Sequence, residues 1–354
     1  VRRGQSPLRT PNHRVDMSTN TQEARAIASI YRSFLISAAL ILLLAACNGE
    51  TDLPPTPTAV PASPTPTQQP PTATPTPEAP PDPTAVPTPQ MGPFGYAMRF
   101  FGTGDEGAGH IKVPLDPPTP ADFGVTDITI EFWIKALPGD NLSPDCQAGP
   151  DGWHGGNLIL DRDVAGPGDR GEYGVSLANG RVAFGVHNGQ AGAGICGLSN
   201  LADGAWHHVA LTRHFSTGDL RLYVDGVLEA EGPGPQGDLT YRDGRPSEFP
   251  DSDPFLFVGA GKDELDPARL GFSGWIDEVR LSSHLAYMGD FDVPTGPFTA
   301  DDRTVALWRF NEGTGEIAVD SSPSGQSPGA VVFVGPQPGP QWVISDLEIS
   351  EPDN

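Results

Sequence analysis

Two adjacent histidines, His207 and His208, are of a residue type that suggests acid–base or metal chemistry. They lie in the run WHHVALTR, whose apolar and β-branched residues are typical of a strand. Successive side chains of a strand point to opposite faces, so the two imidazoles cannot chelate one ion together. We therefore predict that His208 is a buried, hydrogen-bonded core histidine.

Carbohydrate binding needs an exposed aromatic platform with polar groups at its edge. Trp153 lies in the glycine-rich segment PDGWHGG, and a tryptophan in a loop is difficult to bury. Tyr173 and Trp133 lie in predicted strands and are further candidates to line a solvent-facing side of a sheet. The alternative is that the three rings cover a hydrophobic layer.

One cysteine, Cys47, follows an apolar run of fourteen residues, SFLISAALILLLAA, at positions 33–46. A membrane-spanning helix needs about 20 residues, so the run is better interpreted as the core of an export signal, with arginines before it. Its Leu-Ala-Ala-Cys ending resembles the bacterial lipobox. Residues 1–47 are thus predicted to be a signal peptide with lipidation at Cys47; a plain signal peptide or a short anchor is the alternative.

Met17 is a better start than Val1, since it gives an n-region of ordinary length and would leave residues 1–16 outside the translated protein. After the signal, residues 48–93 form a proline- and threonine-rich stalk, with fifteen prolines and ten threonines between 51 and 90. Proline has no N–H donor, so this segment is expected to be a disordered, extended linker.

The other two cysteines, Cys146 and Cys196, lie in glycine-rich sequence. Export would place them in an oxidising compartment, where a disulfide between them is favoured. Closing a loop of this length would stabilise the fold by roughly 3–4 kcal/mol. The alternative is two free thiols.

The elements that must position these residues are short strands. In Asp127–Leu137, DITIEFWIKAL, the isoleucines and phenylalanine alternate with other residues, which predicts a half-buried strand. Similar runs recur at short spacing, and Asn179-Gly180 and Asp225-Gly226 separate two pairs of them as type I′ hairpin turns. The fold class is therefore predicted as all-β, an antiparallel sandwich or jelly roll. The predicted runs are Asn157–Asp161, Glu172–Ala178, Arg181–His187, Trp206–Arg213, Leu220–Asp225, Phe255–Val258, Gly274–Leu281 and Val305–Phe310.

The charge balance excludes one class of function. The chain of 354 residues has 21 Lys and Arg against 45 Asp and Glu, a formal net charge of −24. A nucleic-acid binder needs a basic footprint, so we expect no nucleic-acid partner.

Three separated motifs resemble one known family. AWHHVAL at 205–211, LYVDG at 222–226 and GFSGWIDEVRL at 271–281 are similar, in that order, to signatures of the laminin G-like, concanavalin A-like jelly-roll domain. AMRFFG at 97–102 is similar to the first strand of that family, with Phe101 where an acid is usual. The resemblance covers residues 94–345 and leaves residues 346–354 as an acidic tail.

The resemblance implies a calcium ion near the loop after the first strand. It nominates Asp105 of that loop and Asp277 of the third motif. A segment usually placed before the first strand occurs here at the carboxyl end, LWRFNEGTG at 307–315, and adds Glu312 and Asp320 as candidates. We expect this segment to close the same sandwich rather than begin a second repeat; the alternative for Asp277 is a structural carboxylate.

The sequence gives little support for an enzyme. Glycosidases on this sandwich place two carboxylates on one strand face, whereas Glu264–Ala268, ELDPA, has no second glutamate and contains a proline. No G-x-S-x-G, H-E-x-x-H or P-loop motif occurs.

We expect a non-enzymatic, monomeric surface lipoprotein of a bacterial envelope. Its domain would lie outside the cytoplasm and bind extracellular glycan or protein, with calcium as stabiliser. A polysaccharide-active enzyme and a passive envelope protein are the alternatives.

Overall fold

The computed structural model describes residues 91–103, 107–164, 171–241, 247, 249–262, 270–335 and 338–348. These residues belong to one compact unit of the chain, 82–354. The signal, Cys47, most of the stalk, Asp105 and the segment 264–268 lie outside the described residues. None of the described residues belongs to a helix that is long and apolar enough to cross a membrane.

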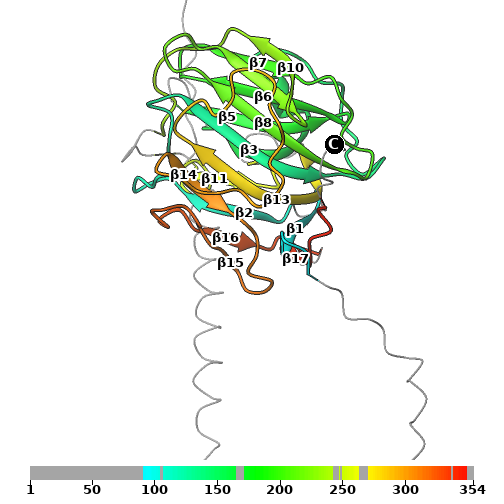
Figure 1. Cartoon of the computed structure of the whole chain (residues 1–354). Helices are drawn as coiled ribbons and strands as arrows, with labels where there is room; N and C mark the ends of the chain where they lie inside the picture. Colours follow the sequence, from blue (N-terminus) through cyan, green and yellow to red (C-terminus); the bar gives the residue numbers. More distant parts are fainter. Residues whose placement is uncertain are drawn as a thin grey trace, which may run out of the picture. The chain divides into compact units, whose positions relative to one another are not determined.

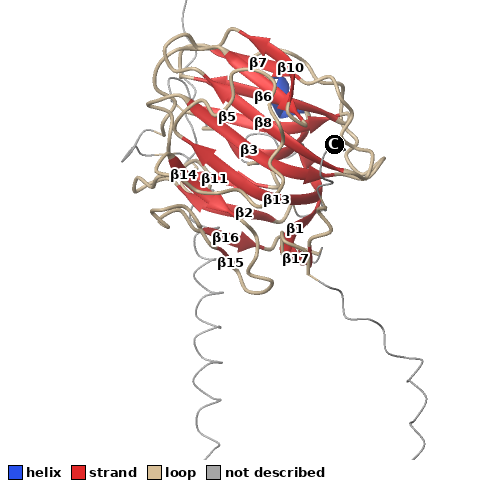
Figure 2. Ribbon diagram, viewed as in Figure 1, coloured by secondary structure: helices blue, strands red, loops and turns tan. Residues whose placement is uncertain are grey.

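Strands make up nearly all the regular structure of the described part, with one short 3-10 turn, η1, at Gly152–Gly155 (Figure 2). The strands are β1 Tyr96–Phe101, β2 His110–Pro114, β3 Ile128–Lys135, β4 Asn157–Arg162, β5 Glu172–Ala178, β6 Arg181–His187, β7 Gly192–Cys196, β8 Trp206–Arg213, β9 Leu220–Val224, β10 Val227–Gly232, β11 Phe255–Val258, β12 Leu270–Gly271, β13 Ser273–Ser282, β14 Thr304–Trp308, β15 Ile317–Ala318, β16 Gly329–Val332 and β17 Gln341–Ile344.

The strands form two sheets that pack as a sandwich (Figure 1). The first sheet has the order β10-β9-β8-β3-β13-β1-β17, with β14 also paired to β13. The second has the order β15-β16-β2-β11-β4-β5-β6-β7, with β12 parallel to β4 and all other pairs antiparallel. The predicted all-β sandwich is confirmed.

The core lies between the inner faces of the sheets. In β3 the alternate residues Ile128, Ile130, Phe132 and Ile134 are all fully or almost fully buried in it. The opposite face of β3 is buried too over most of its length, because the loop 283–303 between β13 and β14 lies against it. A period-two pattern predicted the inner face, but it could not show which outer residues a later loop would cover.

Both predicted hairpin turns are confirmed. Asn179 and Gly180 have φ values of 47° and 81°, and Asp225 and Gly226 have values of 48° and 80°. Two successive positive φ values define the type I′ turn, which matches the twist of the strands that it joins.

The carboxyl-terminal segment closes the same sandwich. β14 pairs with β13, β16 pairs with β2, and β17 pairs with β1. The sequence pattern missed β2, β7, β16 and β17, which are only four or five residues long. The two-residue strands β12 and β15 were missed as well. Length alone does not explain the misses, because β9, β11 and β14 are equally short and were predicted.

Candidate functional site

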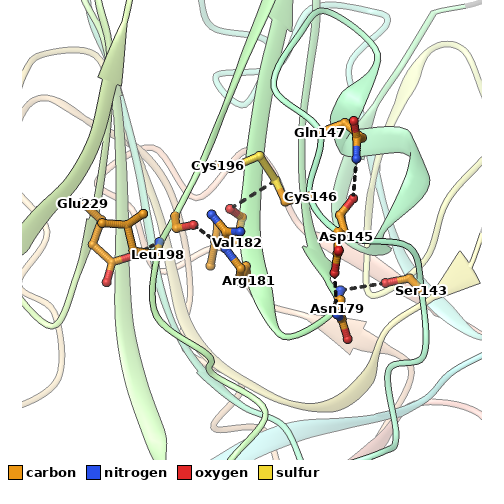
Figure 3. Close-up of a disulfide and its surroundings, with 11 residues drawn as sticks. Ser143, Asp145, Cys146, Gln147, Asn179, Arg181, Val182, Cys196, Leu198 and Glu229 are labelled. Atoms are coloured by element: carbon orange, nitrogen blue, oxygen red, sulfur yellow. Dashed lines mark hydrogen bonds between the residues drawn. A yellow bond between two sulfur atoms is a disulfide. The ribbon is translucent and has the colours of Figure 1, made fainter.

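The predicted disulfide between Cys146 and Cys196 is present, with its Cα atoms 6.0 Å apart (Figure 3). Cys196 is the last residue of β7, not part of a loop as the glycine content suggested. The bond ties the loop 136–156 to an edge strand of the second sheet. Asn179 holds the same loop through hydrogen bonds with Asp145 and Ser143 (Figure 3). The disulfide therefore has a structural role.

The prediction that Trp153 would be exposed is wrong, since only 3% of its surface is accessible. It packs across β5 and β6 where Gly174 and Gly185 stand directly opposite each other. A Cβ on either glycine would overlap the indole ring. The two paired glycines thus leave space for the indole ring of Trp153. The pattern of one strand does not show that they pair.

The other two predicted platform residues are buried as well. Tyr173 is 0% exposed and packs within the main core, and Trp133 is 4% exposed beneath the loop 283–303. Burial raises the pKa of the Tyr173 phenol. The hydrophobic-layer interpretation therefore holds for all three rings, and none of them presents a face to solvent.

The acidic residues nominated for calcium have protein partners. Asp277 is fully buried, where it accepts hydrogen bonds from Ser345 and from the backbone of Glu278. Burial and the adjacent charge of Glu278 raise the pKa of Asp277. Asp320 accepts four hydrogen bonds, from the backbones of residues 307, 322 and 327 and from the Ser322 hydroxyl.

Glu312 caps the backbone N–H of Val319 with one oxygen, while its second oxygen is buried without a partner. Within the described ranges, no three acidic, histidine or cysteine residues lie close enough together to hold a metal ion. Calcium needs six to eight oxygen ligands, so these residues by themselves do not supply a calcium site. The remaining candidate, Asp105, lies outside the described part of the chain.

A buried polar cluster occupies the outer face of the first sheet beneath the loop 283–303. The Glu131 carboxylate is 0% exposed and lies 2.8 Å from both an Arg280 guanidinium nitrogen and the Tyr287 hydroxyl. His208 Nε2 is 3.4 Å from the same carboxylate. Burial alone would raise the pKa of Glu131, but the contacts with His208 and Arg280 outweigh it and lower the pKa.

His208 is fully buried, as predicted, but the predicted hydrogen bond is absent, since neither ring nitrogen has a hydrogen-bond partner. Aromatic rings surround it. The ring centroids of Trp133, Phe298 and Phe291 lie 5.3, 5.6 and 5.7 Å from that of the imidazole. The cluster combines groups that could do acid–base chemistry, but Glu131 and His208 have no exposed surface, and Arg280 and Tyr287 are only partly exposed. Its geometry is that of a structural network that fixes the loop on the sheet.

A β-bulge in β13 makes this arrangement possible. Asp277 is opposite Trp133 and Arg280 is opposite Glu131, so β13 has one residue more than β3 between the two pairs. Glu278 lies within this bulge and has a positive φ of 51°. Glu278 binds Arg309 and the backbone N–H of Phe298, which anchors the loop at its far end.

A different surface opens at the other end of the same face. Five residues from five neighbouring strands stand directly opposite one another in register, and we call them the outer row: Gln341 of β17, Arg99 of β1, Trp275 of β13, Lys135 of β3 and Trp206 of β8. Because neighbouring strands lie about 4.8 Å apart, the row is roughly 19 Å long. Its residues are exposed or partly exposed.

Cations and rings alternate along the outer row. The Arg99 guanidinium lies 4.2 Å from the centre of the Trp275 ring and Lys135 Nζ lies 5.4 Å from it, while Phe101 is 4.9 Å from the same guanidinium. Each cation has a carboxylate partner: Asp140 for Arg99 at 3.7 Å and Asp346 for Lys135 at 2.5 Å.

Asp346 also accepts a hydrogen bond from Trp206 Nε1 at 2.8 Å. Burial alone would raise its pKa, but the hydrogen bonds from Lys135 and Trp206 lower it. The carboxylate is therefore ionised at neutral pH. The outer row offers apolar ring area, donors and acceptors side by side, which is the mixture that a sugar ring needs for its C–H faces and hydroxyl rim.

Sequence reasoning selected the wrong aromatics for a surface site. Trp206 and Trp275 lie in two of the three motifs that resemble the family, and the sequence alone gives them no surface role. The register that aligns them with Arg99 and Lys135 joins residues from 99 to 341 and is visible only once the sheet is known.

Comparison with known proteins identifies one family. The family model described as the concanavalin A-like lectin/glucanases superfamily matches residues 105–286, just over half of the chain. A search among curated proteins gave no match.

Solved structures also resemble the chain. A putative carbohydrate binding protein from Bacteroides ovatus ATCC 8483 aligns at 18% identity and a TM-score of 0.47, covering 72% of this chain and 61% of that one. Domains LG4-5 of the mouse laminin alpha1 chain align at 18% identity and a TM-score of 0.36, covering 57% of this chain and 47% of that one. The chain thus spans less than two thirds of either protein.

Proposed function

The chain belongs to the concanavalin A-like lectin/glucanase superfamily, and we propose that it is a non-catalytic module that binds extracellular glycan through the outer row. The observation that supports this most is the in-register placement of Trp206 and Trp275 with Arg99 and Lys135 between and beside them. Side chains fixed on five paired strands lose little freedom on binding, so a ligand meets a preorganised surface.

The buried cluster around Glu131 supports the absence of catalysis. A general acid or base has to come within hydrogen-bond distance of the group that it protonates or deprotonates. Glu131 and His208 are 0% exposed and enclosed by aromatic rings, so substrate does not reach them in this arrangement. Within this cluster, the two residues best suited to acid–base chemistry, Glu131 and His208, therefore do not face solvent.

Display at the cell surface is part of the proposal and rests on the sequence. A lipid on Cys47 and a proline-rich stalk would hold the domain outside the cytoplasm of a bacterial cell. Mass spectrometry of the protein from its native host tests this: a diacylglycerol-modified amino-terminal Cys47 supports it. An intact precursor with an unmodified thiol contradicts it, with C47S as the control.

Calcium stabilisation is likewise a prediction, and its described candidates already have protein partners. It depends on Asp105 and the loop around it, together with backbone carbonyls. If calcium binds there, chelator lowers the thermal midpoint of the wild type and leaves that of D105N unchanged. Equal midpoints with calcium and with chelator contradict the prediction.

Glycan binding is tested on a glycan array with the purified chain. The wild type is compared with W275A and with F333A, which removes an aromatic ring that is 55% exposed just after β16 and is not a member of the outer row. We expect W275A to lose at least about 30-fold in affinity, because truncating a central aromatic costs about 2 kcal/mol or more. F333A keeps wild-type binding.

The other functions are tested on the same purified chain by a turnover assay and by an assay of binding to extracellular protein. Turnover of any bound polysaccharide, abolished by replacing one carboxylate, would establish an enzyme. Binding to extracellular protein but to no glycan would assign a protein ligand, and silence in both assays would leave a passive envelope protein. Equal binding by wild type and W275A would move the site away from the outer row.

A further inference from the structure

The charges along the outer row are paired in a way that bears on which glycans it takes. Arg99 faces Asp140, and Lys135 faces Asp346. Both cations of the outer row therefore have a carboxylate beside them.

The positions of the carboxylates make them the more accessible partners. The side chains of Arg99 and Lys135 are 14% and 16% exposed, whereas those of Asp140 and Asp346 are 34% and 66% exposed. An approaching ligand therefore meets carboxylate oxygens before it meets the cations. Those oxygens accept hydrogen bonds from sugar hydroxyls, but they repel sulfate and carboxylate groups.

Asp346 is held in this position by its neighbours in the chain. Ser345 donates a hydrogen bond to the buried Asp277, and Leu347 is buried among Phe94, Trp133 and Phe298. The backbone on both sides of Asp346 is thus anchored. The carboxylate is a built part of the surface, with Lys135 and Trp206 as its donors.

The field of the whole molecule has the same sign. A formal net charge of −24 gives a negative potential that disfavours anionic ligands at long range. Like charges brought together in a contact add a further penalty at short range.

We propose that the outer row selects neutral glycans over anionic ones, and that Asp140 and Asp346 are the residues that determine this choice. The inference rests on the proposed glycan-binding function. It assigns a substrate class to the row and gives the two carboxylates a double role, as acceptors for sugar hydroxyls and as a barrier to acidic sugars.

The test compares matched ligands on matched variants. The full chain is titrated with neutral glucans, galactans, xylans and mannans and with the sulfated derivative of each, at low and moderate salt. The variants are D140N/D346N and a control, D151N/D302N, which makes the same change in net charge at two exposed positions outside the row. Folding of each variant is checked by its thermal midpoint.

For a neutral glycan that the wild type binds, we expect sulfation to weaken binding about 10-fold or more at low salt, with a smaller difference as salt is raised. D140N/D346N should reduce the ratio of neutral to sulfated affinity several-fold and should also bind the neutral glycan more weakly. D151N/D302N should keep the wild-type ratio.

Tighter binding of a sulfated derivative than of its neutral parent by the wild type would overturn the inference and leave glycan binding intact. An equal gap in D140N/D346N and D151N/D302N would also overturn it, since net charge would then explain the preference. Failure of the wild type and both variants to bind any glycan would instead overturn the proposed function.

Discussion

The outer face of the first sheet has two halves built from the same strands. On β3 and β8, Glu131, Trp133 and His208 lie under the loop 283–303, while Lys135 and Trp206, two residues further along the face, lie beyond it. One half has become a second, polar-lined core, and the other has become a surface with paired charges. The comparison shows that a covering loop, not the strand pattern, decides whether an aromatic residue supports the fold or meets a ligand.

The largest effect on stability is expected on the covered side. E131A leaves Arg280 and the Tyr287 hydroxyl without their shared partner in a buried setting. Breaking a buried ion pair in this way costs about 3–5 kcal/mol, so the free energy of unfolding by urea should fall by that amount. K135A, on the open side, removes a pair whose carboxylate is largely exposed and should cost less than about 1 kcal/mol. Similar losses for E131A and K135A would remove the distinction between the halves.

The packing of Trp153 against Gly174 on the second sheet allows a second comparison between a covered position and an open one. G174A adds a methyl group where the indole ring lies, and overpacking of a core costs about 1–3 kcal/mol. G289A is the matched control, because a Cβ there meets nothing within 4 Å. Equal thermal midpoints of the two variants would show that the loop 136–156 yields without cost.

Features set by residues close together in the sequence could be predicted, whereas most features set by residues far apart in the sequence could not. Type I′ turns at Asn179-Gly180 and Asp225-Gly226, the buried His208 and the disulfide were predictable, because neighbouring residues or a simple count decide them. Exposure of Trp153 was predicted wrongly, because Gly174 and Gly185 act only once β5 and β6 are paired. The outer row escaped prediction for the same reason, since its members come from five separated strands.

A smaller effect is expected from pH at the start of β8. Hydrogen bonding to Asp225 raises the pKa of His207, although burial opposes the shift. The folded-state pKa then exceeds the unfolded value of about 6.5, so the contribution to stability is full below that pH. It is lost as pH rises through the folded-state pKa. H207Q should remove this component of the pH dependence of urea unfolding, and an unchanged pH profile would contradict it.

The central claim, that the open half binds glycan while the covered half only supports the fold, is tested most directly by one titration. The affinity of W275A for a glycan identified with the wild type is measured by calorimetry, alongside its thermal midpoint. Our account predicts a loss of about 30-fold or more in affinity with a midpoint close to that of the wild type. Full affinity in a folded W275A would contradict it.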